Sequence, residues 1–268
     1  MRAPLAVCGN VAIDVIDGQP ATVGGGPFHC GHALRLLERP SRVVAKCAPG
    51  DRAIVLSPLA ALGVPLTLVD GETTASFALS YDGEIRRTEM LAVGDPWRPT
   101  DLGGVDGLRW VHVAPLARSD FPAETLAALA QECRVSYDGQ GLVRLPQLGP
   151  VTLDAEFDRS VLEHISFLKL AQEEAATILP DESDESVFAL GVPEVVITFG
   201  SQGSVVYADG RRTEVPCHPI LGVDLTGCGD AYAVGYLAAR SDGLSPVAAA
   251  RRATALVALL LTSRKRGR

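Results

Sequence analysis

The sequence lacks the features of an exported or membrane-bound protein. No basic segment followed by a long apolar run opens the chain, so no signal peptide is expected. The six cysteines form no Cys-x-x-Cys pair, a distribution typical of free thiols in a reducing compartment. The longest aliphatic run, residues 253–261, is too short to cross a bilayer. We therefore expect a cytoplasmic protein with no membrane partner.

Positive charge and two common nucleotide motifs are also scarce. The formal net charge is −8, which disfavours nucleic acid as a partner. The basic residues 264–268 are interpreted as a short frayed tail. There is no Gly-x-x-x-x-Gly-Lys-Ser/Thr, which excludes a P-loop enzyme. No Gly-x-Gly-x-x-Gly follows the first apolar run, which disfavours dinucleotide binding.

The chain does contain a long alternation of apolar runs and helical segments. Hydrophobic residues make up 47% of the 268 residues and charged ones 21%, which is enough for a sizeable core. Repeated β-α units predict an α/β fold with a mainly parallel sheet covered on both faces. No repeat or linker divides the chain, so residues 1–268 are expected to form one domain. Strands are expected at 4–8, 11–16, 41–47, 66–69, 110–114, 135–138, 165–170, 195–199, 203–207 and 211–215, and helices at 29–37, 52–62, 123–132, 173–179 and from about 228 and 245.

A segment late in the chain has the features of an anion site. Gly227, Cys228, Gly229 and Asp230 open a predicted helix, whose first N–H groups converge at the positive end of the helix dipole. Glycine lets the backbone approach a ligand closely. The Asp230 carboxylate can accept a proton from a substrate hydroxyl while the amides stabilise a phosphoryl group in transfer. The alternative is a glycine-rich turn whose aspartate only caps the helix.

This segment, from Asp224 to Asp230, resembles the second signature of the ribokinase-like (PfkB) family of carbohydrate and nucleoside kinases. Cys228 stands where the family usually has Ala, and Leu225 where Thr is common. The resemblance implies a three-layer ribokinase-like sandwich with a small β-sheet lid. It also implies ATP and Mg²⁺ as cofactors, Asp230 as general base and the backbone amides of residues 227–230 as the anion hole.

Residues early in the chain resemble the acceptor side of this family. An acid inside an apolar run is costly unless it is hydrogen-bonded, and Asp14 lies in such a run. The family places a substrate-gripping aspartate here, which implies that Asp14, with Asn10 nearby, binds the acceptor. An edge-strand aspartate that faces water is the alternative. Gly25 and Gly26 resemble the glycine pair that lets the sugar approach the backbone.

The residues after these glycines depart from the family pattern. The family usually has an Asn where Cys30 and His32 stand, so the acceptor cannot be transferred from ribose or fructose kinases. His29, Cys30 and His32 fit no standard zinc spacing and are interpreted as helix-face or pocket residues.

Two alternating segments around Asp82-Gly83 predict a β-hairpin. By the family resemblance, residues 17–23 and 73–94 form the lid. Its apolar face can close on the substrate or pair with another subunit as a homodimer. A plain surface hairpin is the alternative.

A polar loop follows the strand expected at 135–138. Its amide and guanidinium, on Gln140 and Arg144, suit a polyhydroxylated acceptor that becomes a phosphate ester. The segment from Asp138 to Arg144 resembles the Asp-x-Gln-x-x-x-Arg region of myo-inositol kinases within the family. An ordinary surface loop is the alternative.

The segment from Phe167 to Ala175 resembles the Asn-x-x-Glu segment of the family. Glu174 takes the place of the glutamate that orders Mg²⁺, usually through water. Lys169 of the same segment is assigned to the cofactor side. Ala171 replaces the family Asn, which puts the usual metal geometry in doubt. The alternative for Glu174 is an exposed helix residue.

A Thr-x-Gly-x-x-Gly segment resembles the nucleotide loop of the family. Thr198, Gly200 and Gly203 are therefore expected to bind ATP, together with Asp224 and Thr226 of the second signature.

The sequence thus predicts ATP-dependent phosphorylation of a hydroxyl on a small polyol or sugar, with myo-inositol favoured. A nucleoside kinase of the same fold is the first alternative. A sensor that binds sugar or nucleotide without chemistry is the second, and Ala171 keeps it open. The presence of Asp230 in the anion hole argues against a sensor, because a binder needs no base there.

Overall fold

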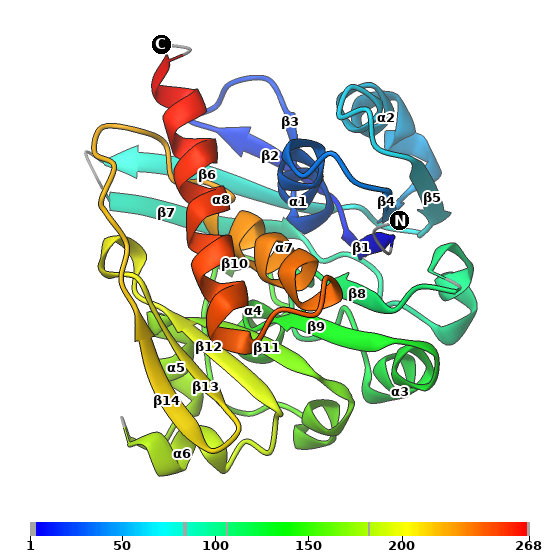
Figure 1. Cartoon of the computed structure of the whole chain (residues 1–268). Helices are drawn as coiled ribbons and strands as arrows, with labels where there is room; N and C mark the ends of the chain where they lie inside the picture. The colour runs from blue at the N-terminus through cyan, green and yellow to red at the C-terminus, as the bar shows by residue number, and fades with distance from the viewer. Residues whose placement is uncertain (1–3, 83–84, 106, 182, 267–268) are drawn as a thin grey trace.

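The computed structural model describes residues 4–82, 85–105, 107–181 and 183–266. Its main sheet has nine strands. They are β1 (Leu5–Asn10), β4 (Ser41–Cys47), β5 (Leu66–Asp70), β8 (Trp110–Val113), β9 (Arg134–Asp138), β11 (Phe167–Ala171), β12 (Glu194–Thr198), β13 (Ser204–Ala208) and β14 (Arg211–Val215). Their order is β14-β13-β12-β11-β9-β8-β1-β4-β5. The strands from β5 to β12 in this order run parallel, whereas β13 runs antiparallel to both of its neighbours, β12 and β14 (Figure 1).

Helices cover both faces of this sheet, as predicted. One face packs against α1 (Gly26–Leu36), α2 (Arg52–Ala60), α7 (Cys228–Ser241) and α8 (Pro246–Arg266). The other packs against α3 (Ala123–Glu132), α4 (Gln140–Val143), α5 (Gln172–Ile178) and α6 (Asp184–Phe188), with 3₁₀ turns at Pro99–Gly104 and Arg159–His164. Successive strand residues face opposite sides, so Leu5 and Val7 join the first core and Ala6 and Cys8 the second. The three-layer α/β sandwich is confirmed.

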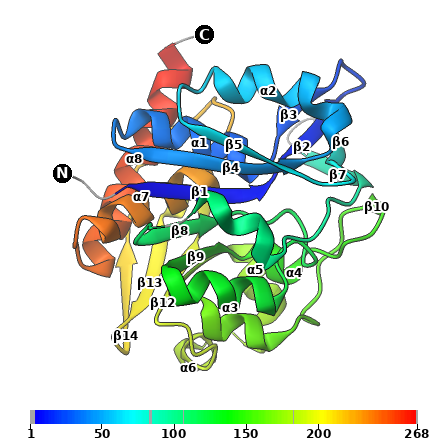
Figure 2. The same ribbon diagram turned by 90° about the vertical axis from the view of Figure 1, so that its right-hand side faces the viewer.

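A second, smaller sheet lies at the end of the main sheet toward which β1 points (Figure 2). It contains β2 (Ala12–Ile16), β3 (Thr22–Gly24), β6 (Ala75–Asp82), β7 (Ile85–Ala92) and β10 (Gly149–Pro150), in the order β10-β7-β6-β2-β3. The predicted hairpin is β6–β7, and Gly83 of its expected turn lies outside the described residues. The sheet also takes in residues 12–16 and 149–150, which the expected lid at 17–23 and 73–94 omits. Its closure over a substrate and its pairing with a second subunit stay predictions.

Helices α1 and α8 differ most from the sequence prediction, while α2 and α5 differ by one or two residues at their ends. Helix α1 begins at Gly26, three residues before the predicted 29–37, with Pro27 in its first turn. Helix α8 continues through Arg266, so the frayed tail expected at 264–268 is wrong for residues 264–266, and residues 267–268 lie outside the described part of the chain. By length and composition, Pro246–Lys265 is apolar enough to cross a membrane, unlike the shorter run 253–261. It packs on α7, however, and Ala253 and Leu256 belong to the first core.

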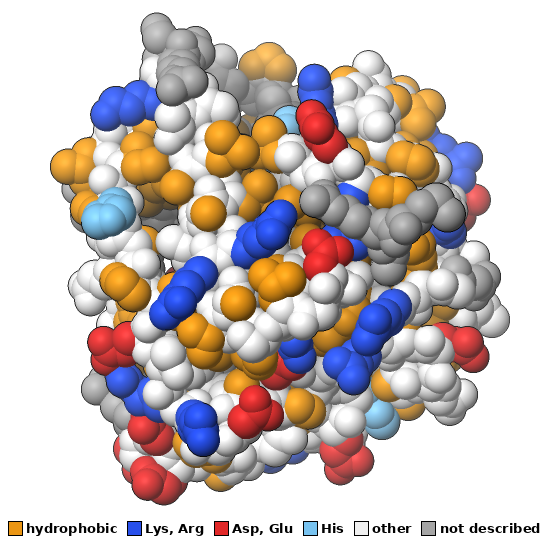
Figure 3. All heavy atoms as spheres, viewed as in Figure 1, with side chains coloured by type: hydrophobic (Ala, Val, Ile, Leu, Met, Phe, Trp, Pro, Cys, Tyr) orange, Lys and Arg blue, Asp and Glu red, His pale blue; other side chains and the backbone are white. Residues whose placement is uncertain are grey.

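Charged side chains are dispersed over the face that carries α8. Figure 3 shows Lys and Arg side chains on this face scattered among acidic and apolar ones, rather than gathered in one basic patch. The six cysteines are free thiols, and Cys8, Cys30 and Cys47 are buried.

Candidate active site

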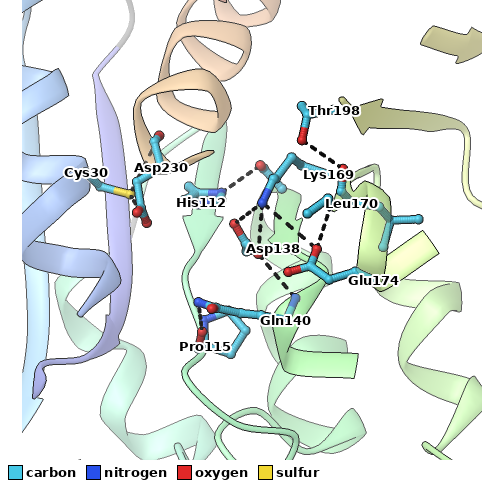
Figure 4. Close-up of polar contacts among 12 residues, drawn as sticks. Cys30, His112, Pro115, Asp138, Gln140, Lys169, Leu170, Glu174, Thr198 and Asp230 are labelled. Atoms are coloured by element: carbon cyan, nitrogen blue, oxygen red, sulfur yellow. Dashed lines mark hydrogen bonds and ion pairs between the residues drawn. The ribbon is translucent and has the colours of Figure 1, made fainter. Parts of the chain in front are cut away.

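Chemistry-bearing side chains collect where the parallel strands end. Asp138 ends β9, Lys169 lies near the end of β11, and Thr198 ends β12. Because parallel strands share one carboxyl edge, these residues meet there (Figure 4). The N-terminus of α7, with Asp230, lies at the same edge, beside Cys30 of α1 (Figure 4).

Asp230 occupies the first turn of α7. The N-cap of the helix is Gly227, whose φ of 75° is left-handed and suits glycine. The Cys30 thiol donates to Asp230 Oδ1 at 3.5 Å. Burial raises the pKa of Asp230, while the nearby charges of His29 and Lys169 and the Cys30 hydrogen bond oppose the rise. A carboxylate with a raised pKa is suited to accept a proton from a hydroxyl.

The predicted anion hole is built from the backbone at this turn. The Cys228 amide donates to the Leu225 carbonyl at 3.1 Å and closes the turn. The Ala231 amide donates to the Gly227 carbonyl at 2.9 Å. The Gly229 amide belongs to the first turn, whose N–H groups precede the regular intrahelical bonds. The role of these amides toward a phosphoryl group stays a prediction.

A buried ammonium group lies beneath this helix start. A Cβ atom added to Gly229 would lie 3.1 Å from Lys169 Nζ, so the glycine allows the two to approach. Lys169 Nζ lies 3.1 Å from Asp138 Oδ2 and 4.0 Å from Glu174 Oε2. Burial alone would lower the pKa of Lys169, but the two carboxylates outweigh it and keep the pKa above its ordinary value. Positive charge is therefore fixed under the N-terminus of α7.

Glu174, the predicted magnesium ligand, is buried with 8% of its surface exposed, so the alternative of an exposed helix residue is wrong. Its Oε2 accepts from the Ala171 amide at 2.7 Å. Burial raises its pKa, and the charge of Lys169 opposes this. No group of three or more His, Cys, Asp or Glu in the described chain is arranged to hold a metal. Mg²⁺ that arrives on donor phosphates needs only one or two carboxylates, so the assignment stays a prediction.

The expected acceptor side comes from β2, β3 and the start of α1. Asp14 is half-buried on β2, which lies between β6 and β3, so the edge-strand alternative is wrong. Its carboxylate packs so closely on Gly24 that a Cβ there would clash. Gly25 has a φ of 85°, and a Cβ there would lie 2.9 Å from the Asn10 carbonyl oxygen. Gly26 begins α1, one turn before Cys30, so the glycine pair and Asp230 are joined through one helix.

Two predicted acceptor ligands use their amides within the protein. Asn10 is buried, donates to the Asp95 carbonyl at 3.1 Å and accepts from the Trp97 indole at 3.0 Å. Gln140 Nε2 donates to the Pro115 carbonyl at 2.6 Å. Both side chains hold loops at the carboxyl edge, and direct contact with an acceptor stays a prediction.

Arg144 connects α4 to the smaller sheet. It follows α4, and its guanidinium carbon lies 5.8 Å from the centre of the Phe77 ring on β6. Arg144 therefore joins the end of α4 to the smaller sheet, and its contact with an acceptor stays a prediction.

The predicted donor loop is a tight turn after β12. Thr198 Oγ1 donates to the Leu170 carbonyl at 3.2 Å. Gly200 and Gly203 have φ values of 55° and 101°, and a Cβ on Gly203 would clash with the Val215 carbonyl. The glycines are thus required by the turn itself, and their contact with a nucleotide stays a prediction.

Asp224 and Thr226 shape the loop ahead of α7. Asp224 Oδ1 accepts from the Thr226 amide at 2.9 Å and from its hydroxyl at 2.7 Å. Arg264 of α8 reaches the same loop, although the sequence indicated only a basic tail.

A buried His–Ser pair was also not foreseen. His112 Nδ1 lies 2.8 Å from Ser136 Oγ, and burial lowers the pKa of His112 to about 4. The sequence feature that could have indicated this pair is the presence of a polar residue, His112 or Ser136, inside each of two otherwise apolar strands, β8 and β9.

Comparison with known proteins bears on this geometry. A sequence profile described as pfkB family carbohydrate kinase matches residues 62–267. The chain belongs to the PfkB family of carbohydrate kinases. A solved structure of a pyrophosphate-dependent kinase in the ribokinase family, complexed with a pyrophosphate analog and myo-inositol, has a TM-score of 0.83 and 25% identity and covers 96% of this chain and 95% of its own. Ribokinase from Thermotoga maritima, 17% identical, has a TM-score of 0.73, covers 97% of this chain and 93% of its own, and shows the shared fold alone.

Among curated PfkB relatives, inositol 3-kinase of Zea mays is 31% identical over 184 residues, or 66% of this chain. That match covers 45% of the maize enzyme. Matches to two further curated relatives cover 28% and 48% of their lengths, so this chain spans less than half the length of these proteins.

Proposed function

We propose that this PfkB chain transfers a phosphoryl group from a phosphoanhydride donor to a hydroxyl of a cyclic polyol, with myo-inositol favoured. The placement of Asp230 carries this proposal: a half-buried carboxylate with a raised pKa stands in the first turn of a glycine-started helix. The similarity to a structure that contains myo-inositol and to a plant inositol 3-kinase supports the acceptor.

In the proposed reaction, Asp230 accepts the proton of the acceptor hydroxyl as its oxygen attacks the terminal phosphorus of the donor. The bond from that phosphorus to the bridging oxygen breaks, and the released phosphate or nucleoside diphosphate takes the electron pair. The N-terminus of α7 and the Lys169 ammonium below Gly229 stabilise the charge on the transferred group. Asp14 and the glycines beside it would orient the acceptor hydroxyls.

The comparisons offer a second candidate for the phosphoryl donor beside the predicted ATP. ATP was expected, whereas the similar kinase complexed with myo-inositol is pyrophosphate-dependent. ATP and pyrophosphate share a terminal phosphoanhydride, which is what a helix N-terminus and a buried ammonium recognise. A donor-bound Mg²⁺ would neutralise phosphate charge, with Glu174 as its predicted protein partner.

The test offers both donors and a panel of acceptors to the full chain. Product is followed by phosphorus NMR with Mg²⁺, using ATP or pyrophosphate as donor and inositol isomers, ribose, fructose or nucleosides as acceptor. We expect an inositol phosphate ester, and the more efficient donor identifies the donor class. A nucleoside monophosphate as main product would support the nucleoside kinase instead, and acceptor binding by calorimetry without turnover would support the sensor.

A pair of variants tests the role of the base. Asp230→Asn should lower kcat by about 10³-fold or more while leaving the fold intact. Asp209→Asn is the matched control, because Asp209 is exposed at the β13–β14 turn with a φ of 52° that asparagine tolerates. Near-normal turnover in Asp230→Asn would sink the assignment.

A further inference from the structure

The last turns of α8 reach the loop that precedes α7. Arg264 Nη1 donates one hydrogen bond to the carbonyl oxygen of Asp224 and one to that of Thr226, both at 2.8 Å. These two residues lie three and one positions before Gly227, the N-cap of α7. A single cationic nitrogen therefore joins the last helix to the loop that leads into the anion site.

The shape of the loop makes a cation at this point favourable. Asp224 Oδ1 binds both the amide and the hydroxyl of Thr226, which turns the chain tightly. The two carbonyl oxygens then converge on one nitrogen. The negative ends of converging carbonyl dipoles repel each other unless a positive charge lies between them. Main-chain carbonyls in such an arrangement are typical ligands of a bare metal cation, and here the guanidinium occupies their focus.

The charge of Arg264 also acts on the start of α7. Burial would raise the pKa of Asp224, but the Thr226 hydrogen bonds and the Arg264 charge outweigh it and hold the pKa below its ordinary value. Burial raises the pKa of the Cys228 thiol, and Arg264 opposes that rise. Arg264 therefore places positive charge close to the helix terminus that carries Asp230.

We propose that Arg264 is a built-in cation that positions the loop 224–227, so that the anion site forms without a monovalent metal ion on these carbonyls. Arg264 acts through the loop and not on the reacting atoms, so it is a positioning residue. The inference goes beyond the proposed function, and only its kinetic test rests on that function.

The first test needs no enzymatic activity. Hydrogen exchange at residues 222–230 is compared in wild type, Arg264→Ala and the control Lys265→Ala, which removes an exposed charge from the same helical turn. We expect exchange about tenfold faster in Arg264→Ala, reversed by millimolar guanidinium or by potassium, and unchanged in Lys265→Ala. Unchanged exchange in Arg264→Ala, or faster exchange that neither cation reverses, would overturn the proposal.

The kinetic test asks whether a free cation can replace the side chain. Wild-type turnover should be the same in tetramethylammonium, sodium and potassium buffers. In Arg264→Ala, kcat/KM for the donor should fall about tenfold and recover with guanidinium or potassium, which a merely structural defect would not do. A potassium requirement in wild type would overturn the proposal. Absence of transferase activity in wild type would instead count against the proposed function, and hydrogen exchange would still decide the role of Arg264.

Discussion

Lys169→Met removes an ammonium group that lies between two buried carboxylates. Lys169 and Asp138 are 6% and 5% exposed and lie 3.1 Å apart, and Glu174 lies 4.0 Å away. Methionine keeps most of the length and packing of lysine, so the change isolates the charge. Removing one partner of a buried ion pair costs about 3–5 kcal/mol, because the other charge is left uncompensated. That loss is about a third of the free energy of unfolding of a typical domain.

A second substitution separates this charge effect from packing. Asp138→Asn in the Lys169→Met background removes one of the buried carboxylates that lost its cation. It keeps a side-chain oxygen that can accept from the backbone N–H of Gln140, as Asp138 Oδ1 does at 3.2 Å. The double variant should therefore recover about 2 kcal/mol relative to Lys169→Met alone. It should still bind the donor poorly, because the positive charge under α7 is gone.

The loss in Lys169→Met should also depend on pH. Burial raises the pKa of Glu174, and Lys169 opposes this, so without Lys169 the pKa rises further. A carboxyl whose pKa is higher in the folded state contributes stability at low pH and loses it as pH rises. Stability should therefore fall as the pH rises above the unfolded-state pKa of a glutamate, and more steeply in Lys169→Met than in wild type.

Urea unfolding at several pH values, followed by fluorescence of the buried Trp97 and Trp110, measures these effects. If the unfolding free energy of Lys169→Met were within about 1 kcal/mol of the wild-type value, the reasoning would be refuted, because a solvent-exposed ion pair contributes that much. The reasoning would also be refuted if the double variant lost the sum of the unfolding free energies lost by Lys169→Met and by Asp138→Asn alone.

Two further predictions follow from buried groups near the site. Cys30→Ala removes the thiol that donates to Asp230, so the pKa of the base and the acid limb of the kcat/KM profile should rise by about half a pH unit. Cys30→Ser should restore the wild-type pH profile of kcat/KM, and an equal rise of the acid limb in Cys30→Ala and Cys30→Ser would contradict the role of the thiol. The second prediction concerns stability: burial raises the pKa of Asp120 to about 7, so this group contributes stability below its unfolded-state pKa of about 4 that is lost as pH rises through 7. Asp120→Asn should flatten this dependence by about 4 kcal/mol at most, and thermal unfolding between pH 4 and pH 8 that keeps the wild-type slope would contradict it.

Local sequence patterns predicted most of the secondary structure. Strand β4 and helix α3 have the predicted bounds, because their apolar periodicity is strong and their neighbours end them clearly. The ends of α1 and α8 were missed. Pro27 at the start of α1 and the basic residues at the end of α8 are compatible with both helix and loop, and tertiary packing decides between them.

The chemistry of the site was predicted less evenly. Glycine and aspartate types at fixed spacing indicated the start of α7, since an anion site needs that local backbone. The burial of Glu174, by contrast, depends on its packing against Lys169 and the Ala171 amide after the sheet has formed.

The sequence by itself determined the alternation of the long strands and helices, the glycines ahead of α1 and α7 and the residue types that can carry phosphoryl transfer, because each depends on neighbours in the chain. Only the tertiary structure decided that Cys30 meets Asp230 and that Arg264 meets Asp224. The first contact needs α1 packed on α7, and the second needs α8 packed to its last turn. Such contacts join residues far apart in the chain, and no local pattern encodes where two packed helices place their side chains.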